Sequence, residues 1–268
     1  MKPILKWVGG KTQILSTVLG EFPRTMESYH EPFLGGGSVL LGVLTSNIEI
    51  RGTIYASDVN PHLINVYLAI RNTPAELVAH LREFETDADA EPFYYEMRTR
   101  FNTSEPKSGP RHAAMFLYLN KTCFRGIYRE GPSGFNVPYG HYKAKFKTPE
   151  AEILAMSPLL QRVEFRCQSF EESLAVARTG DFVYLDPPYV PKNATSFVGY
   201  VSGGFDKHTE LFNAIKSLPC GFLMSNADVP AVRDAFMGYN VKGLTCRRAI
   251  HSRDPSSTAQ EVLITRSL

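Results

Sequence analysis

Apolar residues along the chain fall into two kinds of segment, short apolar runs and longer stretches with helical spacing. Short runs bounded by turn residues predict buried strands, whereas apolar residues three and four apart predict amphipathic helices. The segments that predict strands cover residues 28–33, 53–57, 163–170, 182–185, 221–227, 243–250 and 261–267. The stretches that predict helices cover residues 39–44, 61–72, 171–178, 208–218 and 229–236. Because strands and helices alternate, we expect an α/β fold around a parallel sheet, closed by an antiparallel pair.

The middle of the chain breaks this alternation. Amphipathic stretches there predict three consecutive helices, which cover residues 74–84, 93–101 and 113–120. Glycine and proline then recur through residues 126–140, which is typical of a β-hairpin and its loops. We therefore expect residues 73–148 to form an inserted domain, with residues 1–72 and 149–268 forming the main α/β domain.

Charge is distributed unevenly, although the formal net charge is only +2. Residues 98–147 hold ten lysines and arginines against two acids, Glu105 and Glu130. This segment therefore carries +8, which leaves −6 for the rest of the chain, and nine aromatic residues lie among its charges. A basic, aromatic-rich block is typical of a surface that binds nucleic acid. A solvated face above a few buried rings is the alternative.

Several classes of protein are disfavoured by what the sequence lacks. The four cysteines are Cys123, Cys167, Cys220 and Cys246, and no CxxC or Cys/His ligand spacing occurs among them. We therefore expect reduced thiols and no metal site. No apolar run has the length of a signal peptide's core or approaches the roughly 18 residues of a membrane span. The expected protein is cytoplasmic, in a bacterium or a virus-infected host cell, without a membrane partner.

The strongest chemical signal is Asp186-Pro187-Pro188-Tyr189, directly after the predicted strand 182–185. Ligands of open α/β sheets gather at the carboxyl ends of the strands. Two consecutive prolines lack N–H donors, so we expect the sheet ladder to end there and to leave backbone carbonyls free. A carboxylate, a free carbonyl and a ring together suit the binding of a planar amino group by both its hydrogens. An ordinary turn after a strand is the alternative.

A second signal is the glycine-rich turn of residues 31–38, EPFLGGGS, between a predicted strand and helix. Glycines at such a turn let the backbone approach a nucleoside closely. Asp58 follows roughly 20 residues later at the end of the next predicted strand, where an acid accepts from ribose hydroxyls. Asp58 as a cap of the following helix is the alternative, and one residue can do both.

The segment KWVGGKT, residues 6–12, ends like a phosphate-binding loop. However, Leu5 occupies the position at which that motif needs glycine, and no strand precedes it. This excludes a P-loop nucleoside triphosphatase. Trp7, the only tryptophan, lies next to two glycines and suits a cap over a bound cofactor.

Five motifs occur in one order: KWVGGK, EPFLGGGS, SDVN, LYLNKTCFRGIYR with FNVPYGHYK, and DPPY. From about Lys6 to the C-terminus, this series resembles the Dam-type DNA adenine-N6 methyltransferases of the D12 class (alpha group). The resemblance implies a class I S-adenosylmethionine-dependent methyltransferase fold, with a Rossmann-like sheet and an inserted, mainly helical target-recognition domain with a β-hairpin. It also implies a site-specific, adenine-specific DNA methyltransferase that transfers a methyl group from S-adenosylmethionine to a flipped adenine in double-stranded DNA, with no metal.

The resemblance assigns roles to particular residues. The residues expected to be catalytic are Asp186, Pro187, Pro188 and Tyr189. The residues expected to line S-adenosylmethionine are Trp7, Lys11, Phe33, Gly35, Gly37, Ser38, Asp58, Val59, Ser169, Phe170 and Asp186, with Ser169 and Phe170 on the strand before DPPY. The residues expected to contact DNA are Phe124, Arg125, Ile127, Arg129, Asn136, Pro138, His141 and Lys143.

Two departures from the family concern the recognition sequence. Where enzymes that read GATC commonly carry Tyr-Asn-Gly-Leu, this chain has Phe-Arg-Gly-Ile at residues 124–127, and His141 replaces a phosphate-contacting arginine. Arginine suits guanine, whereas asparagine suits adenine. We expect a short palindromic site containing adenine, with GATC first and CATG second. A cognate restriction endonuclease is a functional partner that the resemblance allows, without physical contact being implied.

Other activities stay open at this point. Methyltransferases that act on RNA adenine, cytosine N4 or protein glutamine use related proline-aromatic loops, and a non-catalytic DNA-binding protein could keep the same fold. Asp186 and the motif order favour DNA adenine, the basic segment disfavours a protein substrate, and intact motifs disfavour a loss of activity. Cytosine-C5 methylation needs a catalytic cysteine, and none follows a proline at the end of a predicted strand. A nicotinamide dehydrogenase is disfavoured because no GxGxxG occurs.

Overall fold

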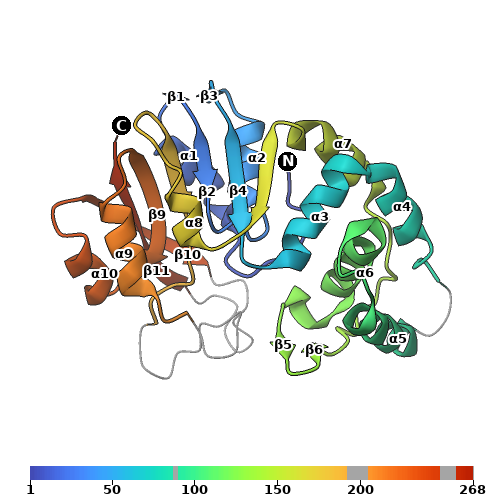
Figure 1. The fold of residues 1–268 in the computed structure, drawn as a ribbon. Helices are drawn as coiled ribbons and strands as arrows, with labels where there is room; N and C mark the ends of the chain where they lie inside the picture. Colours follow the sequence, from blue (N-terminus) through green and yellow to red (C-terminus); the bar gives the residue numbers. More distant parts are fainter. Residues whose placement is uncertain (87–89, 192–204, 248–257, 268) are drawn as a thin grey trace.

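A computed structural model describes residues 1–86, 90–191, 205–247 and 258–267, which form a seven-stranded sheet with helices on both faces (Figure 1). The strands lie in the order β10-β11-β9-β8-β2-β4-β7. Their bounds are β2 (Tyr29–Glu31), β4 (Ile54–Asp58), β7 (Val163–Cys167), β8 (Phe182–Leu185), β9 (Gly221–Ala227), β10 (Asn240–Arg247) and β11 (Thr258–Arg266). Strand β11 is antiparallel to both of its neighbours, and the remaining pairs are parallel. This topology confirms the expected α/β, Rossmann-like fold.

The central strands β2, β8 and β9 are buried throughout because both faces of the sheet are covered. Along β8, Phe182 and Tyr184 join one hydrophobic cluster, while Val183 and Leu185 join another on the opposite face. The first cluster includes side chains of α1 (Leu15–Gly20), α2 (Ser38–Leu44), α3 (Pro61–Asn72) and α7 (Glu150–Leu160). The second includes side chains of α8 (Phe170–Leu174), α9 (His208–Lys216) and α10 (Pro230–Ala235). The two clusters hold the strand ends at one edge in fixed positions.

The middle of the chain forms a group of elements to one side of the sheet (Figure 1). These elements are α4 (Pro74–Arg82), α5 (Ala90–Thr103), α6 (Gly109–Thr122), η2 (Phe124–Gly126), β5 (Glu130–Gly131) and β6 (Gly134–Phe135). Strands β5 and β6 form an antiparallel hairpin, as the glycines and prolines predict. Helix α6 packs against α3 as well as α4, so this group shares a core with the helices of the sheet.

The predicted strand over residues 163–170 is too long, and the structure corrects the places of Ser169 and Phe170. Strand β7 ends at Cys167, and Ser169 is the N-cap of α8. The Ser169 hydroxyl accepts from the Glu172 backbone N–H at 3.3 Å, and the Glu172 carboxylate accepts from the Ser169 N–H at 2.8 Å. This reciprocal capping box begins a helix where the sequence analysis continued the strand. Helix α8 then ends at Leu174, short of the predicted residue 178.

Other boundaries differ by a few residues. Strand β2 is shorter than the predicted 28–33, and β10 and β11 each begin three residues before their predicted starts. Residues 248–250 of the predicted strand lie outside the described residues. Helix α7 was not predicted, since Pro158 lies inside it. The short elements η1 (Lys11–Gln13), α1, β1 (Thr25–Met26) and β3 (Glu49–Ile50) were not predicted either. None of the described helices is long and apolar enough to span a membrane.

A buried carboxylate joins β2 to β8 at the amino ends of these strands. Asp181 accepts from the Ser28 N–H at 3.0 Å, the Arg178 N–H at 2.9 Å and His30 Nε2 at 2.9 Å. Burial lowers the pKa of His30, although Asp181 acts in the opposite direction, so the ring is neutral and donates from Nε2. These three bonds fix the two strands whose opposite ends carry the motifs.

Replacing Asp181 with alanine should lower the free energy of unfolding by about 3 kcal/mol, because buried donors lose their acceptor. Urea unfolding followed by circular dichroism measures the change. Asp234→Ala removes an exposed acid of α10 and should shift stability by less than about 0.5 kcal/mol. Equal urea midpoints for Asp181→Ala and the unmodified protein would contradict this role.

Candidate functional site

Four neighbouring parallel strands end at one edge of the sheet, and each is followed by a predicted site segment. In the order β8-β2-β4-β7, the predicted site residues at or just after the strand ends are Asp186, the turn around Gly35, Asp58 and Ser169. The carboxyl ends of adjacent parallel strands meet at the same edge. The structure therefore brings together segments that are up to about 150 residues apart in the chain.

Asp186 forms a close ion pair with Lys11. The Lys11 ammonium lies 2.6 Å from Asp186 Oδ2 and donates to the Gly9 carbonyl at 2.6 Å. The two side chains are 5% and 19% exposed. Burial raises the pKa of Asp186, and the Lys11 ammonium opposes that rise. The other carboxylate oxygen, Oδ1, is buried and has no hydrogen-bond partner among the described residues.

Lys11 is held by the first helix after the glycine-rich turn. Its backbone N–H donates to the Ser38 hydroxyl at 3.0 Å, and Ser38 is the buried first residue of α2. Ser38, expected to line the cofactor, is thus engaged with the N-terminal segment. This contact fixes the backbone from which the Lys11 ammonium reaches Asp186.

The loop after β8 is fastened from two other elements. The Tyr189 hydroxyl donates to Glu261 of β11 at 2.8 Å, and burial raises the pKa of Tyr189. His208 Nε2 of α9 lies 2.9 Å from the Pro188 carbonyl. The expectation that the double proline leaves its carbonyls free is therefore wrong for Pro188, because α9 supplies a partner.

The glycine-rich turn and Asp58 support each other. Gly35 and Gly37 have φ of +48° and +66°, which only glycine adopts without strain. The Gly35 N–H donates to Asp58 Oδ2 at 3.0 Å, and the Asn60 N–H donates to Oδ1 at 3.0 Å. Burial raises the pKa of Asp58, while these N–H groups lower it. Each oxygen accepts one of these bonds and keeps a second lone pair for a ligand.

The alternative role of Asp58 as a helix cap is wrong. Helix α3 begins at Pro61, as predicted, and its N-cap is Asn60. The Asn60 side chain accepts from the His62 and Leu63 N–H groups at 3.0 and 3.1 Å. Asp58 is therefore not needed to cap α3 and supports the glycine turn.

Trp7 connects the glycine-rich turn to the middle of the chain. A Cβ atom added to Gly35 would lie 2.9 Å from Trp7 Cδ1, so the indole packs directly on this turn. On its other side the indole stacks on Tyr128, with ring centroids 5.7 Å apart and planes at 25°. Trp7 thus packs on the glycine-rich turn and also reaches the segment that leads into β5, while its role as a cap over a bound cofactor stays a prediction.

The remaining residues expected at the cofactor lie along the same edge. Phe33, which follows β2, stacks on Phe170 with centroids 5.9 Å apart and planes at 25°. Val59 is 63% exposed, unusual for an apolar side chain beside buried strands, and its carbonyl accepts from the Cys167 thiol at 3.7 Å. Ser169 is half-buried at the start of α8. An exposed valine and stacked rings offer an apolar surface for a planar ligand.

On the surface of the middle segment, the structure joins Phe124 to Pro138. The Phe124 N–H donates to the Pro138 carbonyl at 2.8 Å, and the Phe124 side chain is 44% exposed. The Arg125 guanidinium lies 5.1 Å from the Phe124 ring, and Arg125 has φ +58°, uncommon for a side-chain-bearing residue. An exposed ring and an arginine thus project from a tight turn.

A second pair comes from the hairpin. Arg129 Nε donates to Asn136 Oδ1 at 2.7 Å, and both residues are exposed. His141 also has a positive φ, +50°, and its side chain is 70% exposed. Lys143 is exposed too. Ile127 is the exception among the eight residues, because it is half-buried against the hydrophobic cluster.

The basic segment is less positive in the fold than along the sequence. Among the described residues, three of its cations pair with acids that lie just upstream of it, and the pairs are Arg100–Glu96, Arg111–Glu83 and Lys147–Glu85. Exposed cations lie on η2 (Arg125), just before the hairpin (Arg129) and in the loop after it (Lys143). Within the described part of the chain, no cluster of three or more His, Cys, Asp or Glu residues is arranged to hold a metal ion.

Sequence analysis missed several residues that contact the site, and His208 at the Pro188 carbonyl is one of them. Glu261 accepts from Tyr189, but nothing in the sequence shows that β11 would bring it to the loop after β8. Tyr128 was counted only among the aromatics of the basic segment, yet it stacks on Trp7. The FRGIYR motif contains it, but the pairing depends on how the middle segment packs.

A family model and individual relatives both show similarity to DNA adenine methyltransferases. The family model of the D12 class N6 adenine-specific DNA methyltransferases matches residues 7–250. The type II methyltransferase M.MjaIII of Methanocaldococcus jannaschii is 34% identical, over 94% of each chain. The DNA adenine methylase of Escherichia coli K12 is 33% identical, over 94% of this chain and 90% of that one. The retron Ec67 DNA adenine methylase of Escherichia coli is also 33% identical, over 98% and 90%.

Replacing Gly35 with alanine should displace the Trp7 indole and cost about 1–2 kcal/mol, because the new Cβ meets the ring and φ is positive. Trp7 is the only tryptophan, so a red shift of its fluorescence reports the displacement. Gly238→Ala is the matched control, with φ +91° but nothing within 4 Å of the added Cβ. It should lose stability without a spectral shift. An unshifted Gly35→Ala spectrum would disprove the contact.

Proposed function

The chain belongs to the D12 class of N6 adenine-specific DNA methyltransferases, and from that premise we propose how its residues divide the work. Residues 1–72 and 149–268 form the catalytic domain, and residues 73–148 form the target-recognition domain. The enzyme acts on an adenine flipped out of a short palindromic site in double-stranded DNA. An amino group stacked inside a duplex is out of reach of a side chain, so flipping is required.

The methyl donor is S-adenosylmethionine, as in methyltransferases of this family. The edge of the sheet fits such a molecule: Asp58 keeps acceptor capacity for ribose hydroxyls, and the turn at Gly35 and Gly37 lets a ligand approach the backbone. Exposed Val59 and half-buried Phe33, which stacks on buried Phe170, offer apolar contact to a base. When bound, S-adenosylmethionine supplies an electrophilic methyl group at its sulfonium sulfur.

Other residues of the set predicted to line the cofactor support the residues of this site. Trp7 packs on the glycine turn, Lys11 holds Asp186, Ser38 holds Lys11, and Ser169 begins the helix that carries Phe170. Their proposed contribution is to keep the edge in one shape before a ligand arrives, which reduces the ordering cost of binding.

The observation that carries the proposal is the state of Asp186. Lys11 holds Oδ2 and favours the ionised carboxylate, while buried Oδ1 lacks a partner and can accept from a ligand amine. We assign Oδ1 one N6 hydrogen of adenine and the Pro187 carbonyl the other. Holding both hydrogens draws the nitrogen lone pair out of the ring and toward the methyl group. The proton that the methylated amine must lose passes to Oδ1.

The loop residues around Asp186 orient the base. Tyr189 stacks on the adenine, and its hydroxyl bond to Glu261 keeps the ring from turning. Pro188 is held by His208, which fixes the backbone from which the Pro187 carbonyl projects. Because positioning supplies much of the rate of a direct transfer, such supports matter as much as the contacts themselves.

The surface of the middle segment is the proposed DNA contact. Phe124 and Ile127 are assigned to the space that the flipped base vacates, and Arg125 and Arg129 to bases beside it. Asn136, Pro138, His141 and Lys143 follow the DNA along the hairpin and its loop. The exposure of all but Ile127 on one basic, aromatic surface supports this assignment. The proposed site is GATC, which the resemblance to Dam-type enzymes favours. CATG is second, because Arg125 replaces the asparagine common among GATC readers.

We further propose that methylation protects DNA from a cognate restriction endonuclease that acts separately. Two relatives have names that identify them as type II methyltransferases, the class that accompanies such nucleases. Resistance of DNA from cells that express the enzyme to endonucleases that cut unmethylated sites would identify that partner's specificity.

Asp186→Asn should lower methyl transfer at least about 100-fold, because the amide is neutral and a poorer acceptor of the amine hydrogens. Affinity for S-adenosylmethionine should fall far less. Turnover on duplex DNA and calorimetric binding measure the two effects, with Asp206→Asn, an exposed acid just before α9, as the control. Turnover above a tenth of the unmodified enzyme's value would refute the assignment of Asp186.

Arg129→Ala should relax the choice of one base pair, since a bidentate arginine–guanine contact contributes about 1–3 kcal/mol of discrimination. Lys143→Ala should weaken binding to all sequences alike and reduce the salt dependence. Sequencing of DNA methylated by each variant distinguishes the two outcomes. If Arg129→Ala kept its full sequence preference and lost only affinity, Arg129 would be a phosphate contact.

A further inference from the structure

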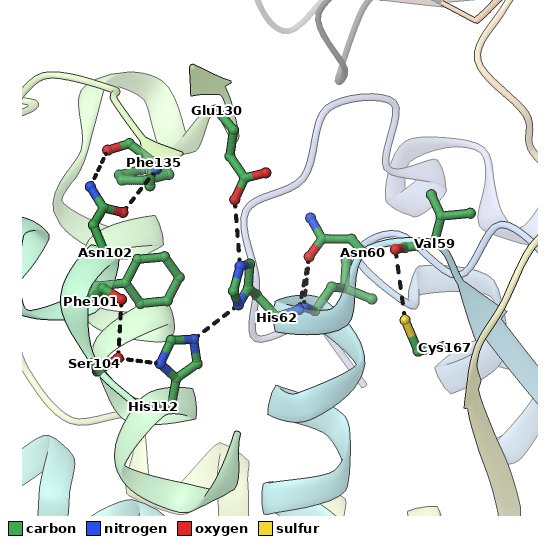
Figure 2. A network of polar contacts seen from close by, with 11 residues as sticks. Val59, Asn60, His62, Phe101, Asn102, Ser104, His112, Glu130, Phe135 and Cys167 are labelled. Atoms are coloured by element: carbon green, nitrogen blue, oxygen red, sulfur yellow. Dashed lines mark hydrogen bonds and ion pairs between the residues drawn. The ribbon is translucent and has the colours of Figure 1, made fainter. Parts of the chain in front are cut away.

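A chain of four polar side chains runs from the end of α5 to the hairpin (Figure 2). The Ser104 hydroxyl lies 2.9 Å from His112 Nδ1. His112 Nε2 lies 2.9 Å from His62 Nδ1, and His62 Nε2 lies 3.5 Å from Glu130 Oε1. The proposed catalytic and cofactor contacts use none of these side chains. Two buried imidazoles in direct contact therefore need another explanation.

Both histidines are neutral at neutral pH. His62 and His112 are 7% and 2% exposed. Burial lowers the pKa of His62, with Glu130 acting against this shift and Lys107 acting with it. Burial, His62 and Lys107 together lower the pKa of His112 to about 4. Each ring therefore carries one N–H and one acceptor nitrogen.

The carboxylate at the end of the chain fixes where each proton lies. An ionised Glu130 only accepts, so His62 must carry its proton on Nε2 to bond it. His62 Nδ1 is then an acceptor and takes the proton that His112 carries on Nε2. The Ser104 hydroxyl lies 3.1 Å from the Phe101 carbonyl as well, and in this arrangement it turns its one proton to His112 Nδ1. His112 then supports the one His62 tautomer that can hold Glu130.

Glu130 lies where it controls the hairpin. It is the first residue of β5 and follows Arg129, whose guanidinium is bonded to Asn136, directly after the facing strand β6. Tyr128, which precedes Arg129, also forms side-chain hydrogen bonds with Glu130 and Asn60. Glu130 is one of two acids in the basic segment. A neutral histidine leaves its charge in place, so the part that His62 plays is to fix where this carboxylate lies.

The other end of the contact is tied to the cofactor edge. His62 lies in the first turn of α3, four residues after Asp58, whose carboxylate supports the turn at Gly35. Figure 2 shows the His62 ring between Glu130 and His112, with Asn60 beside it. The hairpin is therefore fastened to the same short stretch of chain that ends β4 at the cofactor edge.

We propose that His62, held in one tautomer by His112, is a positioning residue for DNA recognition. By bonding Glu130 it sets where Arg129 and Asn136 stand relative to the transferred methyl group. The inference rests on the proposed function, because it takes the hairpin as the DNA-reading surface.

Two amide replacements of His62 separate positioning from simple packing. The glutamine amide nitrogen occupies the place of Nε2 and still reaches Glu130, whereas asparagine places its amide near Nδ1 and does not. His62→Asn should reduce the ratio of methylation rates on cognate and singly mismatched DNA roughly tenfold. His62→Gln should stay within roughly threefold of the unmodified ratio. Glu130 is exposed, so Glu130→Ala should fold normally and match His62→Asn.

The control is His80→Gln, which places its amide near Nε2 and so removes the Nδ1 contact of a histidine of α4 with another acid, Glu83, away from the hairpin. It should leave the ratio unchanged, and all variants should bind S-adenosylmethionine alike. An unmodified enzyme that does not methylate adenine in DNA would refute the proposed function together with the inference. Active His62→Asn and Glu130→Ala enzymes with the unmodified ratio would refute the positioning role alone.

Discussion

The contact between the Lys11 ammonium and the Asp186 carboxylate, 2.6 Å long and largely buried, joins the beginning of the chain to the loop after β8. Lys11 lies in a segment with no strand of its own, so its place depends on Ser38 and on the order of the sheet, in which β8 neighbours β2. A buried carboxylate without a cation would be costly and would take up a proton. With Lys11 present, Asp186 can remain ionised and leave Oδ1 for a ligand.

A second constraint is that two parts of the molecule must keep one relative position. In the proposed function, a base is delivered to Asp186 while the surrounding DNA is held elsewhere, on the middle segment. The packing of α6 on α3 joins these parts, and so do two side-chain contacts: Trp7 lies between the glycine turn and Tyr128, and His62 pairs with Glu130. Both involve residues next to cofactor-edge motifs. Ring packing and a tautomer-specific bond together give a stiffer connection than a single surface ion pair.

The sequence predicted what depends on local chemistry. The strand before Asp186, the glycine turn, the acid after β4 and the hairpin all follow from residue types at short range, and Pro61 correctly marked the start of α3. Contacts between distant segments could not be predicted: Lys11 and Asp186 are 175 residues apart, and Tyr189 and Glu261 meet through β11. The capping box at Ser169 was a missed local signal, because the apolar run beside it favoured a strand.

The central claim is that Asp186 and its loop hold the amino group of adenine in DNA for methyl transfer. Its most direct test is to supply S-adenosylmethionine with a labelled methyl group and duplex DNA, then digest the product and separate the nucleosides. The account predicts that the label appears in N6-methyladenine and, at a palindromic site, equally in both strands. Label in N4-methylcytosine, label only in RNA when both polymers are offered, or no transfer at all would contradict it.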